Sequence, residues 1–173
     1  MIRRFALASA ILIAAGSAAS AAPAMAGSVT SEITVSATVP SSCSISTTPL
    51  AFGSYDPIGT NATAPLDITA TVTTTCTNAM GTRILLGQGA NPSSGSSNFS
   101  PGRRLKSAAG GYINYSIYQD SGRGMVWGND VSTGMSINGT GGPQDTTIYG
   151  RIPAGQAADA VPYSDTVVAT ITF

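Results

Sequence analysis

Apolar and polar side chains alternate with a period of two residues in several segments of this chain. The first such segment places Val29, Ile33, Val35, Ala37 and Val39 on one face of an extended chain, and the residues between them are Thr, Ser and Glu. A period of two is typical of a β-strand with one buried face, because successive side chains of a strand point to opposite sides. We therefore expect residues 29–39 to form a strand that needs a partner sheet.

The same alternation recurs further along. It is clearest in residues 66–73, 113–118 and 163–173, and shorter strands are expected at residues 83–86, 125–127 and 146–152. Residues 87–102 are rich in Gly, Ser, Asn and Pro, which predicts a long surface loop. With 9% charged residues, 20 Gly and no helical periodicity, the chain is predicted to be an all-β sandwich.

In the last alternating segment, one face is predicted to point inward, with Phe173 as a core aromatic. The other face, residues 166, 168, 170 and 172, is predicted to point outward. The inward residues are Tyr163, Asp165, Val167, Ala169, Ile171 and Phe173.

The first residues indicate export. Arg3 and Arg4 precede an apolar run over residues 5–15, and small residues lead to Ala24-Met25-Ala26. This pattern predicts a secretory signal peptide, residues 1–26, cleaved after Ala26. The apolar run is too short for a membrane-spanning helix, and no insertion of the mature chain into a membrane is expected. The remaining chain of roughly 150 residues has the size of one domain.

Pro40 ends the first strand and sets it apart from the rest of the chain, because proline has no backbone N–H for a sheet ladder. We therefore divide the mature chain into an N-terminal strand, residues 27–40, and a sandwich domain, residues 41–173. Cys43 and Cys76 both lie in this domain. Because an exported protein meets oxidising conditions, we predict a disulfide between them.

Several function classes fit the composition poorly. The chain has no His, so a zinc site lacks ligands and an activated Ser nucleophile lacks its usual base. No metal, cofactor or catalytic residue is expected. The mature chain has two more acidic than basic groups, and Arg103, Arg104 and Lys106 are interpreted as a solvated loop face rather than a nucleic-acid site.

Short motifs in a fixed order carry a resemblance. They are Leu50-Ala51-Phe52-Gly53-Ser54-Tyr55-Asp56-Pro57, Arg104-Leu105, Asn114-Tyr115-Ser116-Ile117-Tyr118-Gln119-Asp120, Trp127-Gly128, Ile148-Tyr149-Gly150-Arg151-Ile152-Pro153 and the segment from Tyr163 to Phe173. Together they resemble the spore coat protein U domain family, which includes major subunits of archaic chaperone-usher pili. The chain departs from the family pattern at Val161-Pro162, where the family more often has a Gly.

This resemblance implies an incomplete immunoglobulin-like β-sandwich completed by donor-strand exchange. A periplasmic chaperone would first fill the groove left by the missing strand, contacting the C-terminal strand at Val167, Ala169, Ile171 and Phe173. The N-terminal strand of an identical or related pilin subunit would then replace it at an outer-membrane usher, with Val29, Ile33, Val35, Ala37 and Val39 entering the groove. The product would be an extracellular pilus that serves surface attachment or biofilm formation.

Other interpretations stay open. The N-terminal strand could pair within its own domain as an ordinary first strand. The protein could also be a spore or cyst coat protein, or a surface-binding module that never polymerises. Within a pilus, a single domain of this size favours a shaft subunit over a tip adhesin.

Overall fold

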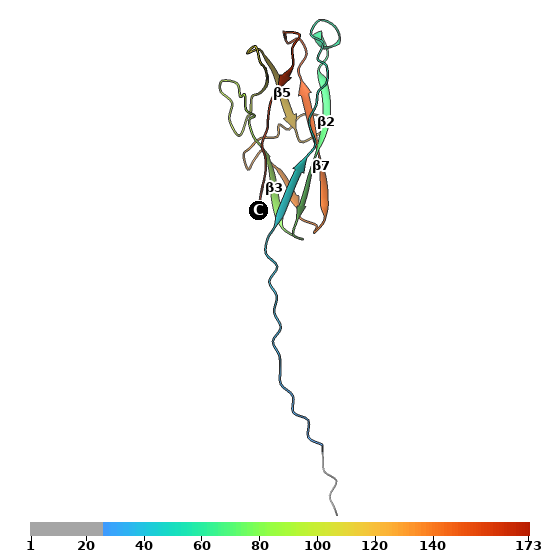
Figure 1. Cartoon of the computed structure of the whole chain (residues 1–173), viewed down its shortest axis with the longest axis vertical. Coiled ribbons are helices and arrows are strands. Elements are labelled where there is room, and N and C mark those ends of the chain that lie inside the picture. Colours follow the sequence, from blue (N-terminus) through green and yellow to red (C-terminus); the bar gives the residue numbers. More distant parts are fainter. Residues whose placement is uncertain (1–25) are drawn as a thin grey trace, which may run out of the picture. The chain divides into compact units, whose positions relative to one another are not determined.

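The computed structural model describes residues 26–173, and its compact body comprises Thr38–Phe173 (Figure 1). Nearly all of the predicted signal peptide lies outside the described residues. Within them, the regular secondary structure is β-strand with one short 3-10 helix and no α-helix. The elements in chain order are β1 (Cys43–Thr47), η1 (Thr60–Ala62), β2 (Leu66–Cys76), β3 (Gly81–Leu86), β4 (Arg103–Ser107), β5 (Tyr112–Tyr118), β6 (Met135–Asn138), β7 (Pro143–Ile152), β8 (Tyr163–Ser164) and β9 (Ala169–Thr172).

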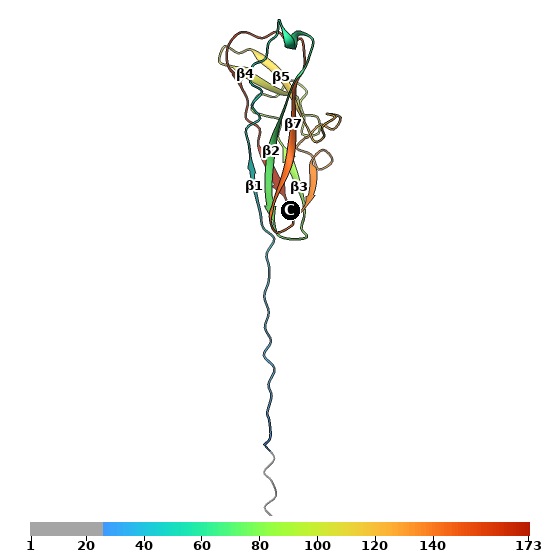
Figure 2. The same cartoon turned by 90° about the vertical axis from the view of Figure 1, so that its right-hand side faces the viewer.

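These strands form two sheets in which every pair is antiparallel. The larger sheet has the order β1-β2-β7-β5-β4-β8, and the smaller has the order β6-β3-β9. The long strands β2 and β7 pair from Leu66 opposite Ile152 to Thr75 opposite Pro143, and they lie side by side in Figures 1 and 2. The predicted all-β sandwich is confirmed.

The core lies between the two sheets. Val72 of β2 and Ile148 of β7 face Ile84 of β3 in one cluster of buried side chains, together with Trp127. The indole Nε1 of Trp127 donates a hydrogen bond to the carbonyl oxygen of Ile84 (2.9 Å), which satisfies the polar end of a fully buried ring. The inward residues of the alternating segments thus supply the core.

The C-terminal segment passes from one sheet to the other. β8 pairs with β4 of the larger sheet, whereas β9 pairs with β3 of the smaller sheet. The single strand predicted over residues 163–173 is therefore two short strands joined by residues 165–168. The predicted inward side chains are partly buried and the outward ones exposed, except that Phe173 is 63% exposed. Phe173 lies beyond the last paired residue, so its prediction as a core aromatic is wrong.

Three further predictions of local structure need correction. Arg103, Arg104 and Lys106 lie in strand β4, and Arg103 is buried, so the interpretation of the basic cluster as a solvated loop face is wrong. β6 forms inside the Gly-rich segment after residue 133, because it pairs with the edge of β3. Residues 125–127 contribute an isolated bridge from Val126 to Tyr118 instead of a strand.

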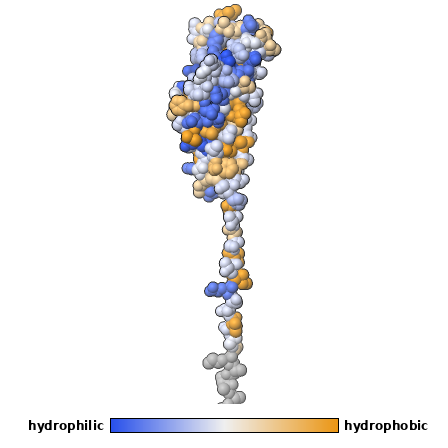
Figure 3. All heavy atoms as spheres, turned by 90° about the vertical axis from the view of Figure 1, so that its left-hand side faces the viewer, coloured by the Kyte–Doolittle hydropathy of each residue, from blue (hydrophilic) through white to orange (hydrophobic). Residues whose placement is uncertain are grey.

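The predicted strand over residues 29–39 is not assigned to any ladder, and residues 26–42 are exposed along their whole length. Val29 is 99% exposed, Ile33 87%, Val35 88% and Val39 77%. Figure 3 shows hydrophobic residues recurring between polar ones along the segment that follows residue 25. The alternation is therefore present in this segment without the sheet that a strand requires.

Candidate functional site

An apolar cavity of about 270 Å³ opens into the body between the two sheets. Its walls come from the segment after β1, from core strands of both sheets and from the segment that joins β8 to β9. We call this cavity the groove. Its lining residues are Thr47, Thr48, Pro49, Leu50, Phe52, Leu86, Leu105, Tyr115, Ile117, Ile148, Asp165, Thr166, Val167 and Ala169.

The groove lies where two sheet edges face one another. β1 is an edge of the larger sheet and β9 is an edge of the smaller sheet, and the two strands lie close together without pairing. Each edge therefore carries backbone N–H and C=O groups that no strand of the described chain satisfies. A strand inserted between them needs the edges about 9.6 Å apart, so β1 and β9 must separate to admit one.

Val167 and Ala169 form the wall of the groove that the C-terminal segment contributes. Both pack against the buried core cluster, while Val168 between them is 67% exposed. The carbonyl oxygen of Val168 accepts a hydrogen bond from Gly87 N (2.9 Å), which holds this stretch against the end of β3. The inward and outward residues thus follow the alternation of the sequence.

Asp165 is the one charged residue in the lining of the groove. One carboxylate oxygen accepts a hydrogen bond from the Tyr115 hydroxyl (2.7 Å), and the other accepts from Ala90 N (2.9 Å) and Asn91 Nδ2 (3.0 Å). Burial and the hydrogen bond to Asp165 raise the pKa of Tyr115 above its usual value. Asp165 thereby fastens both the 87–102 loop and the central strand β5 to the C-terminal segment.

Arg103 holds the end of β3 next to the groove. Its guanidinium donates to the carbonyl oxygens of Leu86 (2.8 Å), Gly87 (2.8 Å) and Trp127 (2.7 Å). Burial lowers its pKa to about 10, so it still carries its charge at neutral pH. Because Leu86 lines the groove, Arg103 holds part of the groove wall in place.

Leu50 and Phe52 form the opposite wall because residue 150 on β7 is a glycine. A Cβ at Gly150 would lie 2.9 Å from Cδ2 of Leu50 and 3.0 Å from Cζ of Phe52, so any larger residue would displace them. Phe52 also packs edge-on against Tyr115, with 5.9 Å between the ring centroids. The segment after β1 is therefore fixed across the face of β7.

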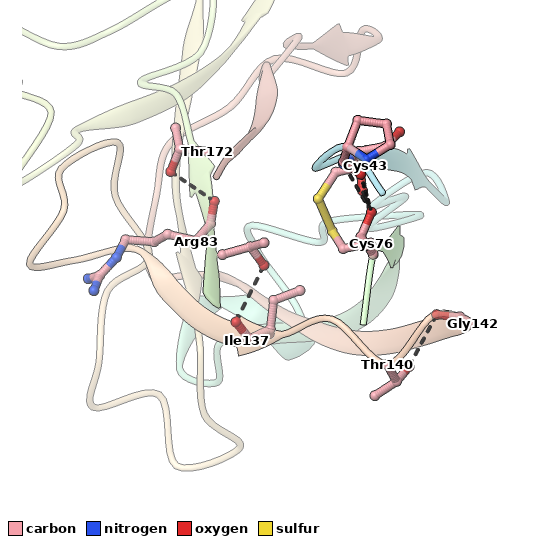
Figure 4. The surroundings of a disulfide bond; sticks show 11 residues. Cys43, Cys76, Arg83, Ile137, Thr140, Gly142 and Thr172 are labelled. Atoms are coloured by element: carbon pink, nitrogen blue, oxygen red, sulfur yellow. Dashed lines mark hydrogen bonds between the residues drawn. A yellow bond between two sulfur atoms is a disulfide. The ribbon is translucent and has the colours of Figure 1, made fainter. Parts of the chain in front are cut away.

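The disulfide joins Cys43 of β1 to Cys76 of β2, as predicted (Figure 4). The two residues are also opposite one another in the β1–β2 register, so the bond closes the end of this ladder. On the neighbouring sheet, the Thr172 hydroxyl donates to the carbonyl oxygen of Arg83, which ties β9 to β3 at the same end of the body (Figure 4).

Thr77 follows Cys76 and binds the chain just before β1. Its hydroxyl accepts a hydrogen bond from Ser42 N (3.1 Å) and lies 3.3 Å from the carbonyl oxygens of Pro40 and Ser42, to either of which it can donate. The N–H of Thr77 donates to the Ser42 carbonyl oxygen (2.9 Å). Thr77 thus holds Pro40 and Ser42, two of the three residues between the alternating segment and β1, through its hydroxyl and its backbone N–H.

Residues 29–170 match the Spore Coat Protein U domain family. The chain belongs to this family. It is 39% identical over 171 residues to Protein U of Myxococcus xanthus, an alignment that covers 95% of this chain and 96% of that protein. Family membership places the chain among structural, non-enzymatic proteins, as the sequence predicts.

A solved structure shares the fold. It is a chain of the CsuC–CsuE chaperone–tip adhesion subunit pre-assembly complex from the archaic chaperone-usher Csu pili of Acinetobacter baumannii, with a TM-score of 0.53 and 22% identity. The match covers 79% of this chain but only 40% of the other, so this chain spans less than half of that one. The predicted immunoglobulin-like sandwich is thereby confirmed.

The structure brings together part of the site predicted for this family member. Val167 and Ala169 line the groove, and Ile171 is partly buried opposite Ile84 on β3. Phe173 does not share their environment. The role of the N-terminal residues 29–39 as a donor strand, and the division of the chain at residue 40, remain predictions.

Sequence reasoning missed Thr77 and the structural role of Arg103. Asp165 carried a signal, since it is the one charged residue on the inward face of the last alternating segment. A carboxylate in that position indicates a buried, hydrogen-bonded group.

Within the described residues, no group of three or more acidic, His or Cys side chains could hold a metal ion, and no helix is long and apolar enough to cross a bilayer.

Proposed function

We propose that this protein is a structural subunit of an extracellular pilus, assembled through a chaperone-usher pathway by donor-strand complementation. The observation that carries the proposal is the apolar groove beside the free edges of β1 and β9, in a chain that also has an exposed alternating segment at residues 29–39. The apolar groove lies between two unpaired strand edges, and the alternating segment has unpaired backbone groups and exposed apolar side chains. Strand addition satisfies both the backbone groups of the edges and the apolar side chains.

The link between the alternating segment and β1, residues 40–42, disfavours insertion of the segment into the groove of its own chain. To enter its own groove beside β1, the segment would have to reverse direction within residues 40–42. Pro40 restricts that turn, and the hydrogen bonds of Thr77 hold Ser42. A second copy has no such restriction, so polymerisation is the favoured outcome.

The partners of the proposed pathway are a periplasmic chaperone, an outer-membrane usher and further copies of this chain or related subunits. The chaperone would occupy the groove first and contact Val167, Ala169 and Ile171 with an edge strand of its own. Family membership and the likeness to a chaperone–subunit complex support this order of events. The assembled fibre would lie at the cell surface and serve attachment or biofilm formation.

The proposal is tested by co-expressing the protein with its chaperone and usher, then recovering surface fibres by shearing. Electron microscopy should show fibres, and mass spectrometry should identify this chain as their subunit. Deleting residues 171–173 should remove the chaperone complex and lead to degradation, because β9 loses half of its ladder to β3. Sheared preparations that contain the protein without fibres would contradict the proposal.

A coat protein is the second candidate, favoured by the 39% identity to Protein U over nearly the whole chain. A coat made by the same strand addition would appear as a continuous layer around the cell rather than as separable fibres. The same micrographs therefore distinguish the two.

A further inference from the structure

The body has two ends, which are defined by the ends of β2. Leu66 follows the segment of residues 56–64, and Cys76 carries the disulfide. The 11 residues of β2 separate the two ends by about 35 Å. Figure 2 shows η1 at one end of β2 and the start of β1 at the other.

A turn at the Leu66 end presents one aliphatic side chain to solvent. Ile58 is 94% exposed at its tip. One carboxylate oxygen of Asp56 accepts hydrogen bonds from Ile58 N (3.3 Å) and Gly59 N (2.9 Å), which folds residues 56–59 tightly. We call residues 56–59 the Ile58 turn.

Neighbouring residues fasten the Ile58 turn to the body. The buried side chain of Asn61 accepts a hydrogen bond from Asp56 N (2.9 Å), and the Asn61 carbonyl oxygen accepts from Gly155 N (2.8 Å). The Tyr55 hydroxyl adds a hydrogen bond to the Pro153 carbonyl oxygen (3.0 Å). None of these bonds involves the Ile58 side chain, so the turn holds an apolar group rigidly in water.

The opposite end has a hollow of about 330 Å³ beside the disulfide. Residues 42–44, residues 75–77 and Gly141 line it. The hollow includes Ser42, which is the last residue of the link between the alternating segment and β1. The hollow therefore lies directly beside the point at which the link joins the body.

Chain length brings these two ends together when strands are exchanged. Only residues 40–42 separate the donor strand from Cys43, and the four steps from Val39 to Cys43 span about 14 Å at most. The disulfide end of the donor body must therefore lie against the acceptor, at the place where the donor strand leaves the groove.

The register of β9 decides which end of the acceptor this is. Ala169 pairs with Leu86 and Thr172 with Arg83, so β9 runs toward the start of β3, which follows Cys76 in the chain. Since β1 runs away from the disulfide end and β9 runs toward it, an inserted strand is antiparallel to only one of them. A strand antiparallel to β1 would leave the groove at the disulfide end, where the acceptor's own residues 40–42 join β1. The donor strand therefore runs antiparallel to β9 and leaves the groove at the end that carries the Ile58 turn.

We infer that in the assembled fibre the Ile58 turn of each acceptor packs into the hollow beside the disulfide of its donor, as a body-to-body contact between copies of this chain. This inference rests on the proposed function, and it adds a second, head-to-tail interface that is distinct from the groove. The contact buries an aliphatic side chain that each free subunit exposes.

A photo-crosslinking residue tests this contact. A benzophenone amino acid replaces Ile58, fibres are assembled and irradiated, and crosslinked peptides are identified by mass spectrometry. We expect crosslinks to peptides of the neighbouring subunit that contain residues 42–44 or 75–77. The same probe at Phe99, which is 62% exposed in the 87–102 loop, is the control and should not label these peptides.

A second variant, Ile58→Asp, should leave the chaperone complex and fibre formation intact, because the groove is unchanged. Sheared fibres of this variant should be shorter than those of the parent protein. Fibres in which position 58 labels other peptides or none, or in which Ile58→Asp leaves the length distribution unchanged, would overturn the inference while leaving the proposed function standing. Failure of the parent protein to form any fibres would instead contradict the proposed function.

Discussion

The hydroxyl oxygen of Thr77 lies 3.3 Å from the carbonyl oxygen of Pro40, and the Thr77 hydroxyl oxygen also accepts a hydrogen bond from Ser42 N. A residue that follows β2 therefore controls the path of the chain before β1. Since Pro40 also has a fixed φ, the backbone of residues 40–42 is restricted at two neighbouring points. Under the proposed function, such a restriction favours insertion into a partner subunit over insertion into the chain's own groove.

Thr77→Val tests this restriction. The variant keeps the shape of the side chain and removes its hydroxyl, so the body should lose about 1 kcal/mol of stability, the contribution of one or two exposed hydrogen bonds. Fibre elongation should slow, and a monomer that fills its own groove should accumulate. Size-exclusion chromatography and light scattering measure both. Thr69→Val, at an exposed position on β2, is the control, and equal behaviour of the two variants would show that the hydroxyl has no such role.

The disulfide should stabilise the body substantially. Cys43 and Cys76 are 33 residues apart, and closing a loop of this length removes chain entropy worth about 3.5 to 4 kcal/mol from the unfolded state. Replacing both residues with Ser should lower the free energy of unfolding by about this amount, as measured by urea denaturation of the complemented protein. Detection of two free thiols in the exported protein by non-reducing mass spectrometry would contradict the assignment.

Arg103→Met should be one of the most damaging single substitutions in the body. It leaves the carbonyl oxygens of Leu86 and Trp127 buried without this donor, at a cost of about 1 to 3 kcal/mol for each. The measurement is chemical denaturation of the complemented protein. Arg104→Met is the matched control, because Arg104 lies over the Tyr112 ring (3.9 Å) and also donates to two backbone carbonyl oxygens, of Asn91 and Pro92. The bond to Pro92 is exposed, so this variant should cost only about 1 kcal/mol. Equal costs for the two variants would show that the buried hydrogen bonds contribute little.

Val35→Asp should abolish fibre growth and leave the chaperone complex soluble. The substitution puts a carboxylate into an apolar groove, which costs several kcal/mol, or somewhat less if the group protonates. Thr34→Asp is the control, since residue 34 points to the opposite side of the strand and should be nearly neutral. Co-purification with the chaperone and the yield of sheared fibres are compared for both. A more damaging Thr34→Asp would show that the register is reversed.

Much of the sandwich was predictable from period-two alternation, because it records which side chains face the core. Val72, Ile113 and Ile148 are buried as their segments predict. The strands β4 and β6 were not predictable in this way. β4 is rich in basic residues and β6 lies in a Gly-rich segment, and both form because an edge of another strand is available to them. Tertiary pairing outweighs local propensity at these positions.

The candidate site was predictable only in part. The alternation of residues 163–173 identified Val167 and Ala169 as inward residues, and both line the groove. Phe173 continues the same pattern but lies beyond the last pair of the ladder, so periodicity alone overextended the strand. The partners of Asp165 lie 50 or more residues away in the chain, and no local pattern contains such distances.

The most direct test of donor-strand complementation is to separate the groove from the strand. A body comprising residues 41–173 is refolded with or without a peptide of residues 27–40, and its soluble yield and thermal midpoint are measured. We expect the body alone to aggregate, because an apolar groove and two sheet edges are exposed, and we expect a soluble, cooperatively unfolding complex when the peptide is present. The peptide carrying Val35→Asp should give no rescue. A body that folds as a stable monomer without any peptide would contradict the account.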